Sequence, residues 1–160
     1  MGAPTTYEGL KTFRFGDSDQ LADRLAALVV AGVKTGTCSA AEHGPDAEIG
    51  EKQVCLNGQD VPVCEIQTLA MQTLPFAAVT PEMAALEGEG DLSYRFWRDA
   101  HQTFFEREGS WAADMHVIFE TFEVTRILDP SFAEAAPAHV KAERAEAFAK
   151  GYTALGASHG

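Results

Sequence analysis

Two strand-forming segments, 53–56 and 61–72, are joined through Asn57-Gly58, and this pair restricts the fold more than any other feature of the sequence. An Asn-Gly pair between two such segments is a strong signal for a turn between antiparallel strands. Pro62 has no backbone N–H to donate, so the second strand is expected to start at a sheet edge. The sequence therefore predicts antiparallel pairing of neighbouring strands.

Helical patterns surround this hairpin. Apolar residues at helical spacing predict a helix over 18–31, with Asp17 or Ser18 as its N-cap and Gly32 as its C-terminal stop. The other segments follow as a strand at 34–39, a loop at 42–48, a short helix from Thr80 to about Glu87, a helix at 91–108, a strand at 117–127, a linker at 129–137 and an alanine-rich terminal helix. This order predicts an α+β fold, in which a small mixed or antiparallel β-barrel is flanked by helices and carries an extra C-terminal helix.

Size and charge narrow the functional classes. The 160 residues suit a single core, which we place in residues 1–128, with residues 129–160 as a linker and helical extension. Twelve basic against 24 acidic residues give a net charge of −12. This charge repels phosphate backbones and argues against a general nucleic-acid binder.

Location and redox state are expected to be those of a cytoplasmic protein. No stretch reaches the roughly 20 apolar residues of a membrane helix, and the N-terminus lacks the basic and apolar regions of a signal peptide. Cys38, Cys55 and Cys64 are odd in number and show no metal-binding spacing, so we interpret them as reduced thiols. We expect no membrane partner, no metal and no other cofactor.

Four stretches, in order, carry a resemblance to a known family. They read FGDS at 15–18, AGVKTGTCS at 31–39, PFAAVT at 75–80 with EGEGD at 87–91, and DMHV at 114–117. Together they resemble the ASCH family (activating signal cointegrator homology) over about residues 13–127, and Gly32-x-Lys34-x-x-Thr37 matches that family's hallmark. The resemblance implies a PUA-like β-barrel with surrounding helices.

The resemblance also implies a set of activities. Members of the family have been associated with RNA binding, with ribonuclease activity and with hydrolysis of cytidine acylated on its exocyclic amine. In the amidohydrolase members, the hallmark Lys and Thr and a Glu in the helix after a Val-Thr segment are the proposed catalytic residues. The matching positions here are Lys34, Thr37 and Glu87.

The chemistry of these three residue types agrees with that assignment. A threonine hydroxyl needs a base to become a nucleophile, and a lysine can be that base only if burial lowers its pKa. Glu87 is then expected to donate a proton to the departing nitrogen. We expect Lys34 to be partly exposed to a cleft. The structural alternatives are a lysine favoured by the helix dipole, a strand-forming Thr37 and a solvated Glu87.

Four further residues are candidates for substrate binding. Tyr94 and Trp97 can stack on a base, although Trp97 also belongs to the apolar stripe of its helix. Ser39 shares a strand face with Thr37, and Asp114 lies at a strand start where polar groups can line a pocket.

The favoured hypothesis is an amidohydrolase that removes the acyl group from N4-acylated cytidine-type nucleosides. One alternative is an ASCH protein that binds or cleaves single-stranded RNA, and another is a non-catalytic nucleoside-sensing module. His101 can act as an acid or base, or serve as a structural hydrogen-bonding residue. The terminal helix can pack on its own domain or against a second subunit, which leaves a homodimer open.

Overall fold

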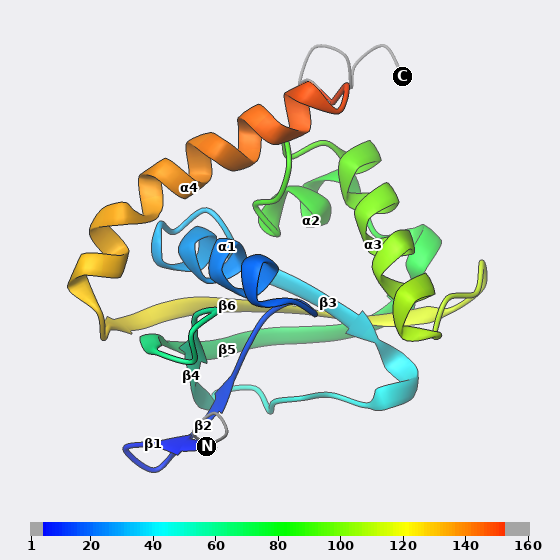
Figure 1. The fold of residues 1–160 in the computed structure, drawn as a ribbon. Coiled ribbons are helices and arrows are strands. Elements are labelled where there is room, and N and C mark those ends of the chain that lie inside the picture. The colour runs from blue at the N-terminus through cyan, green and yellow to red at the C-terminus, as the bar shows by residue number, and fades with distance from the viewer. Residues whose placement is uncertain (1–4, 153–160) are drawn as a thin grey trace.

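The computed structural model describes residues 5–152, and Figure 1 shows helices packed over a curved sheet. The strands of this region are β1 (Thr6–Tyr7), β2 (Leu10–Phe13), β3 (Gly36–Ala40), β4 (Lys52–Leu56), β5 (Pro62–Pro75) and β6 (His116–Ile127). Its α-helices are α1 (Asp19–Val30), α2 (Pro81–Leu86), α3 (Tyr94–Glu108) and α4 (Pro130–Ala149), and short 3-10 turns cover Ala41–His43 and Phe76–Ala78. The predicted α+β class is confirmed.

The strands form one mixed sheet in the order β1-β2-β4-β5-β6-β3. β2 runs parallel to β4, whereas every other neighbouring pair is antiparallel. The β5–β6 ladder runs from Cys64 opposite Ile127 to Pro75 opposite His116, and its register shifts after Glu65 and after Thr68. Such bulges bend and twist the strands, which helps the sheet to curve around the helices.

The hairpin expected from Asn57-Gly58 is present between β4 and β5. The side-chain oxygen of Asn57 accepts hydrogen bonds from the backbone N–H of Gln59 at 2.9 Å and of Val61 at 3.0 Å. The backbone N–H of Asn57 in turn donates to the carbonyl of Val61 at 2.9 Å. The asparagine side chain therefore organises this turn, in agreement with the turn chemistry of that residue.

Two parts of the expected element order were wrong. The short strands β1 and β2 were not predicted, although β2 completes the sheet beside β4. The predicted linker at 129–137 is helical, because Asp129 caps α4 by accepting from the N–H of Phe132 at 3.1 Å and Pro130 occupies the first turn. Pro137 lies inside this helix. The boundary at 128/129 between domain and extension stays a prediction.

Helices α1 and α4 lie side by side, and α4 crosses above α1 in Figure 1. Ser18 caps α1 as predicted, with its hydroxyl oxygen accepting from the N–H of Leu21 at 3.1 Å. Arg24 of α1 forms ion pairs with Glu143 at 3.0 Å and Glu146 at 2.8 Å on α4. Within residues 5–152, no helix is both long and apolar enough to span a bilayer.

Two clusters of buried apolar side chains form the core. One joins α1 to the central strands and comprises Ala26, Val29, Cys55, Val63, Cys64, Ile66 and Phe122. The other packs α2 and α3 on the sheet and comprises Ala40, Phe76, Val79, Ala84, Trp97, Phe105 and Val117. All three cysteines are free thiols. Phe15, which packs against the first cluster, and Trp97 of the second both contact residues of the candidate site.

Candidate active site

Lys34 enters the interior directly after α1. Gly32 ends that helix with a positive φ of 80°, and the backbone N–H of Lys34 donates to the carbonyl of Leu28 at 3.1 Å. The side chain is 1% exposed, and its ammonium lies 5.3 Å from the centre of the Phe15 ring. The expectation that Lys34 is partly exposed was wrong, because the turn after α1 directs the side chain beneath the end of α2.

The ammonium of Lys34 bonds to two carboxylates at once. Its Nζ donates to Glu89 Oε2 at 2.7 Å, to Glu87 Oε1 at 3.2 Å and to the carbonyl of Gly36 at 3.0 Å. A buried ammonium needs such partners, because an unpaired charge in the interior is strongly unfavourable. The lysine is thereby fixed between the strand β3 and the segment that follows α2.

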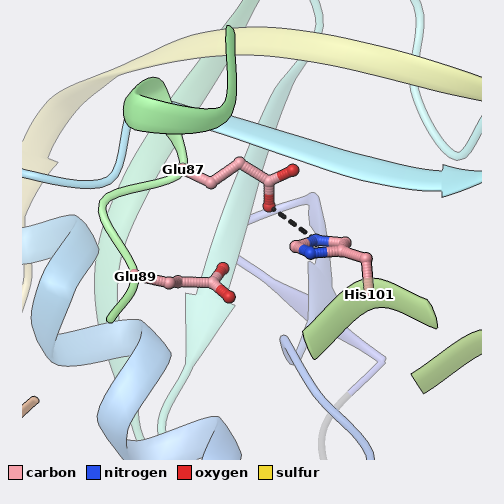
Figure 2. A group of neighbouring side chains, drawn as sticks. All are labelled: Glu87, Glu89 and His101. Atoms are coloured by element: carbon pink, nitrogen blue, oxygen red, sulfur yellow. Dashed lines mark hydrogen bonds and ion pairs between the residues drawn. The ribbon is translucent and has the colours of Figure 1, made fainter. Parts of the chain in front are cut away.

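Glu87 is the most enclosed carboxylate of the site. It caps the C-terminus of α2, and its side chain is 1% exposed. Trp97 donates its indole N–H to Glu87 Oε2 at 2.7 Å, and His101 Nε2 lies 3.1 Å from Glu87 Oε1. Figure 2 shows the imidazole of His101 facing this carboxylate from α3. Both oxygens of Glu87 are thus engaged by buried partners.

Glu89 reaches the same place from a glycine-rich loop (residues 87–91). Gly88 and Gly90 have φ values of 72° and 61°. A Cβ on Gly88 would lie 2.3 Å from the carbonyl oxygen of Val33, so only glycine fits this conformation and this close approach. The Glu89 side chain is 14% exposed, which makes it the more accessible of the two carboxylates.

Burial and neighbouring charges shift the pKa values of these four ionisable residues in different directions. Burial disfavours the charge on Lys34, but the carboxylates of Glu89 and Glu87 outweigh burial and raise its pKa. Burial also opposes ionisation of Glu87, yet His101 and Lys34 lower its pKa to about 2. For Glu89, burial prevails and raises the pKa. Burial opposes the charge on His101, but Glu87 raises its pKa.

Glu87, Glu89 and His101 also have the composition of a metal site, which the sequence spacing did not suggest. One potential ligand atom from each lies within 4.8 Å of the others, and the three side chains converge in Figure 2. The ammonium of Lys34, however, already bonds to both carboxylates. A divalent cation would meet that positive charge at once, so the lysine is the natural cation of this cluster.

A pocket of about 480 Å³ opens onto these groups. Its polar floor includes Lys34, Glu87, Glu89 and His101, and its apolar walls include aromatic side chains from three segments, namely Phe15, Phe96, Phe104 and Tyr152. Thr37 and Cys38 line it from β3. Burial raises the pKa of the Cys38 thiol well above its ordinary value, so this cysteine is not a thiolate nucleophile at neutral pH.

The three residues predicted to be catalytic share this pocket. Lys34, Thr37 and Glu87 all line it. The four predicted substrate-binding residues are absent from its lining: Ser39 lies on β3 farther along, Tyr94 packs on Trp97 at 5.8 Å between ring centres, Trp97 is core, and Asp114 is an exposed residue before β6. Trp97 instead contacts two residues that line the pocket, through its bond to Glu87 and its stacking on His101.

Sequence reasoning missed Glu89 and left the role of His101 open between acid–base chemistry and structural hydrogen bonding. The signal for Glu89 was its position between Gly88 and Gly90, since paired glycines mark a backbone that approaches other groups closely. The signal for His101 was its place one helical turn after Trp97, which puts both side chains on one face of α3. Their rings stack with centres 4.5 Å apart.

Comparisons with known proteins agree with this fold. The family model described as the ASCH domain matches residues 11–126. The crystal structure of an ASCH domain from Lactobacillus crispatus is similar at 30% identity and a TM-score of 0.67, covering 72% of this chain and 79% of that one. A protein from Enterococcus faecalis is similar at 29% identity and a TM-score of 0.65, covering 74% and 81%. A search of curated proteins found no match.

These likenesses decide the fold family. The solved neighbours share the α+β architecture, so the predicted PUA-like fold is confirmed. The family match covers most of the chain and includes Lys34, Glu87, Glu89 and His101. The chain belongs to the ASCH domain family.

Proposed function

We propose that this protein hydrolyses the bond between the acyl group and the exocyclic nitrogen of N4-acylated cytidine-type nucleosides. The observation that carries the proposal is the buried ion cluster of Lys34, Glu87, Glu89 and His101 at the floor of a pocket. Clusters of ionisable groups with displaced pKa values are typical of catalytic sites.

The size and lining of the pocket suit one nucleoside. A volume of about 480 Å³ falls within the range of roughly 300–1,000 Å³ that is typical of small-molecule sites. The rings of Phe15, Phe96 and Phe104 offer apolar faces to a base. Lys34, Glu87, Glu89 and His101 lie close together in this lining, where they can meet the amide bond.

The protonation states favour a different division of roles from the one expected from the sequence. Because its pKa is raised, Lys34 remains an ammonium at neutral pH and is not available as a free amine base. Glu87, with a pKa of about 2, carries no proton to donate. We therefore assign Glu87 to holding Lys34 and His101 in place.

Glu89 is better suited than Lys34 or Glu87 to accept and return a proton during the reaction. Burial raises its pKa above the ordinary glutamate value, which makes its carboxylate a stronger base than an exposed one, and its Oε1 has no hydrogen-bond partner among residues 5–152. Its side chain also lines the pocket. These three properties support Glu89 in the acid–base role.

The hydrolysis can then proceed with these side chains, Thr37 and one water molecule. Glu89 takes a proton from water, and the resulting hydroxide adds to the acyl carbonyl. The hydroxyl of Thr37 donates a hydrogen bond to the oxyanion, and the ammonium of Lys34 stabilises its negative charge. The tetrahedral intermediate collapses, the exocyclic nitrogen leaves with the proton returned by Glu89, and the products are the free cytidine and a carboxylic acid.

RNA binding remains the activity that other members of the family make plausible. In this chain, however, the charge of Lys34 is engaged by two carboxylates rather than free for a phosphate. The net charge of −12 adds a general repulsion of polynucleotides. Both observations favour the small neutral substrate.

The test is an ultraviolet assay of acetylcytidine hydrolysis, run beside a gel assay on single-stranded RNA. We expect wild-type turnover, and a loss of at least about 100-fold in kcat/KM for Glu89→Gln, in line with the loss of a general base. Glu82→Gln, at an exposed position on α2, is the matched control and should retain wild-type activity. Cleavage or tight binding of RNA without acylcytidine turnover would overturn the proposal.

A further inference from the structure

The C-terminal helix holds the loop that carries Glu89. Arg144 of α4 donates from Nη1 to the carbonyl of Gly88 and to the carbonyl of Gly90, both at 2.7 Å. Glu143, its neighbour, accepts from the backbone N–H of Gly90 at 2.7 Å. The two carbonyls bonded to Arg144 stand on either side of Glu89.

This helix is itself anchored on both sides of the pocket. Glu143 pairs with Arg24 of α1 at 3.0 Å. Just after α4, the hydroxyl of Tyr152 donates to Asp99 of α3, and Arg95 donates to the carbonyl of Gly151 at 2.9 Å. Glu143, Lys150 and Tyr152 also line the pocket. The helix therefore has fixed supports from which to hold the loop.

The contact of Arg144 is costly to form, which argues for a specific role. Burial lowers the pKa of this guanidinium, and no carboxylate within residues 5–152 lies at salt-bridge distance from it. A partly buried arginine without such a partner usually weakens a fold. Here its donors are directed to two backbone carbonyls of one loop.

The loop needs an external support of this kind. Gly88 and Gly90 have the widest choice of backbone conformations of any residue, so contacts from outside the loop contribute to fixing its conformation. The 2.7 Å contact between Glu89 and Lys34 requires one particular conformation of that loop. The bond from Arg144 to the Gly88 carbonyl fixes the peptide unit before Glu89, and the bond from the Gly90 N–H to Glu143 fixes the unit after it. The second bond of Arg144, to the Gly90 carbonyl, holds the next peptide unit.

We propose that Arg144 is a positioning residue for Glu89, which makes the helix α4 a working part of the active site. The role of Glu89 in turnover rests on the hydrolase proposal, whereas its placement by Arg144 does not. The helix lies beyond residue 126, where the match to the ASCH family model ends. This chain thus completes its site with a segment outside the family region.

The test compares three variants in the full chain. Arg144→Met keeps the aliphatic stem and removes every donor, and Arg144→Lys keeps a cationic donor. Lys141→Met is the matched control, because it removes one positive charge from an exposed position of the same helix. Thermal unfolding shows which variants are folded, and Arg144→Gln replaces Arg144→Met if the latter does not unfold cooperatively.

The first readout is activity. We expect Arg144→Met to lower kcat by about 10- to 100-fold with KM changed less than about twofold, because a displaced catalytic group costs turnover more than binding. Arg144→Lys should recover most of this loss, and Lys141→Met should match the wild type. A folded Arg144→Met with wild-type kcat would overturn the inference.

The second readout needs no substrate. NMR titration of the Glu89 carboxyl carbon should show its pKa falling toward the ordinary glutamate value in Arg144→Met, because a loosened loop admits water and removes the burial that raises it. An unchanged Glu89 pKa in this folded variant would refute the positioning role. If the wild type proves inactive on acylcytidine while this pKa still shifts, the hydrolase proposal fails and the positioning role stands.

Discussion

Replacing Glu87 with glutamine tests whether the buried ion cluster stabilises the fold in addition to its proposed part in the reaction. The substitution keeps the shape of the side chain but removes the negative charge that faces Lys34 and His101. It also places an amide N–H₂ at one of two positions that now accept hydrogen bonds: the position of Oε1, which Lys34 and His101 contact, or the position of Oε2, to which Trp97 donates. The ammonium would keep only Glu89 as an ionic partner.

The expected magnitude follows from the pKa of Glu87. Its fall from the ordinary value of 4.5 to about 2, at about 1.4 kcal/mol for each pKa unit, corresponds to about 3 kcal/mol of unfolding free energy. Removing one partner of a buried ion pair costs about 3–5 kcal/mol in other proteins, which agrees. Since the folded-state pKa is depressed, this stability is present above about pH 4.5 and is lost as the pH falls toward 2.

Urea denaturation across a pH series measures this contribution. We expect Glu87→Gln to be less stable than the wild type by about 3 kcal/mol near neutral pH, and the difference to shrink below about pH 4.5. Glu82→Gln, at an exposed position, should differ from the wild type by less than about 0.5 kcal/mol. A loss below about 1 kcal/mol near neutral pH, or a loss independent of pH, would refute the reasoning.

Two further outcomes follow from the charges of the site. The KM for acylcytidine should change less than about twofold between roughly 50 and 300 mM salt, because the substrate is neutral, whereas even a few phosphate contacts would weaken RNA binding far more; a steep salt dependence of KM contradicts this. Hydrolysis should persist in EDTA, because the ammonium of Lys34 already bonds to both Glu87 and Glu89; activity lost in the chelator and restored by zinc or magnesium would show that the cluster binds a metal.

Local signals account for what the sequence predicted correctly. Ser18 caps its helix as expected, the short helix expected from Thr80 is present with Thr80 as its cap, and Asn57 makes the expected turn. Each of these interactions spans only a few residues, so local propensity decides it. The strands β1 and β2 were missed because they are short and β2 is completed by parallel pairing with the distant β4. Asp129-Pro130 is a helix start that Pro137 obscured.

The site shows the same division between local and distant determinants. The hallmark placed Lys34 and Thr37 correctly in the pocket, but the sequence alone could not supply the environment of the lysine. Its pKa depends on two carboxylates that lie 53 and 55 positions away in the chain. The hypothesis that Lys34 is the base required burial to lower its pKa, whereas ion pairing with these two carboxylates in the folded chain raises it.

The bonds from Arg144 to the carbonyls of Gly88 and Gly90 have an evolutionary consequence. They join a stretch that the family model does not cover to a loop that it does. Mutation in the C-terminal helix can therefore alter the site while every residue of the shared domain is inherited intact. Paralogues with identical hallmark residues can diverge in activity by this route. The residues that follow the ASCH domain should therefore be compared as well before a function is transferred from one homologue to another.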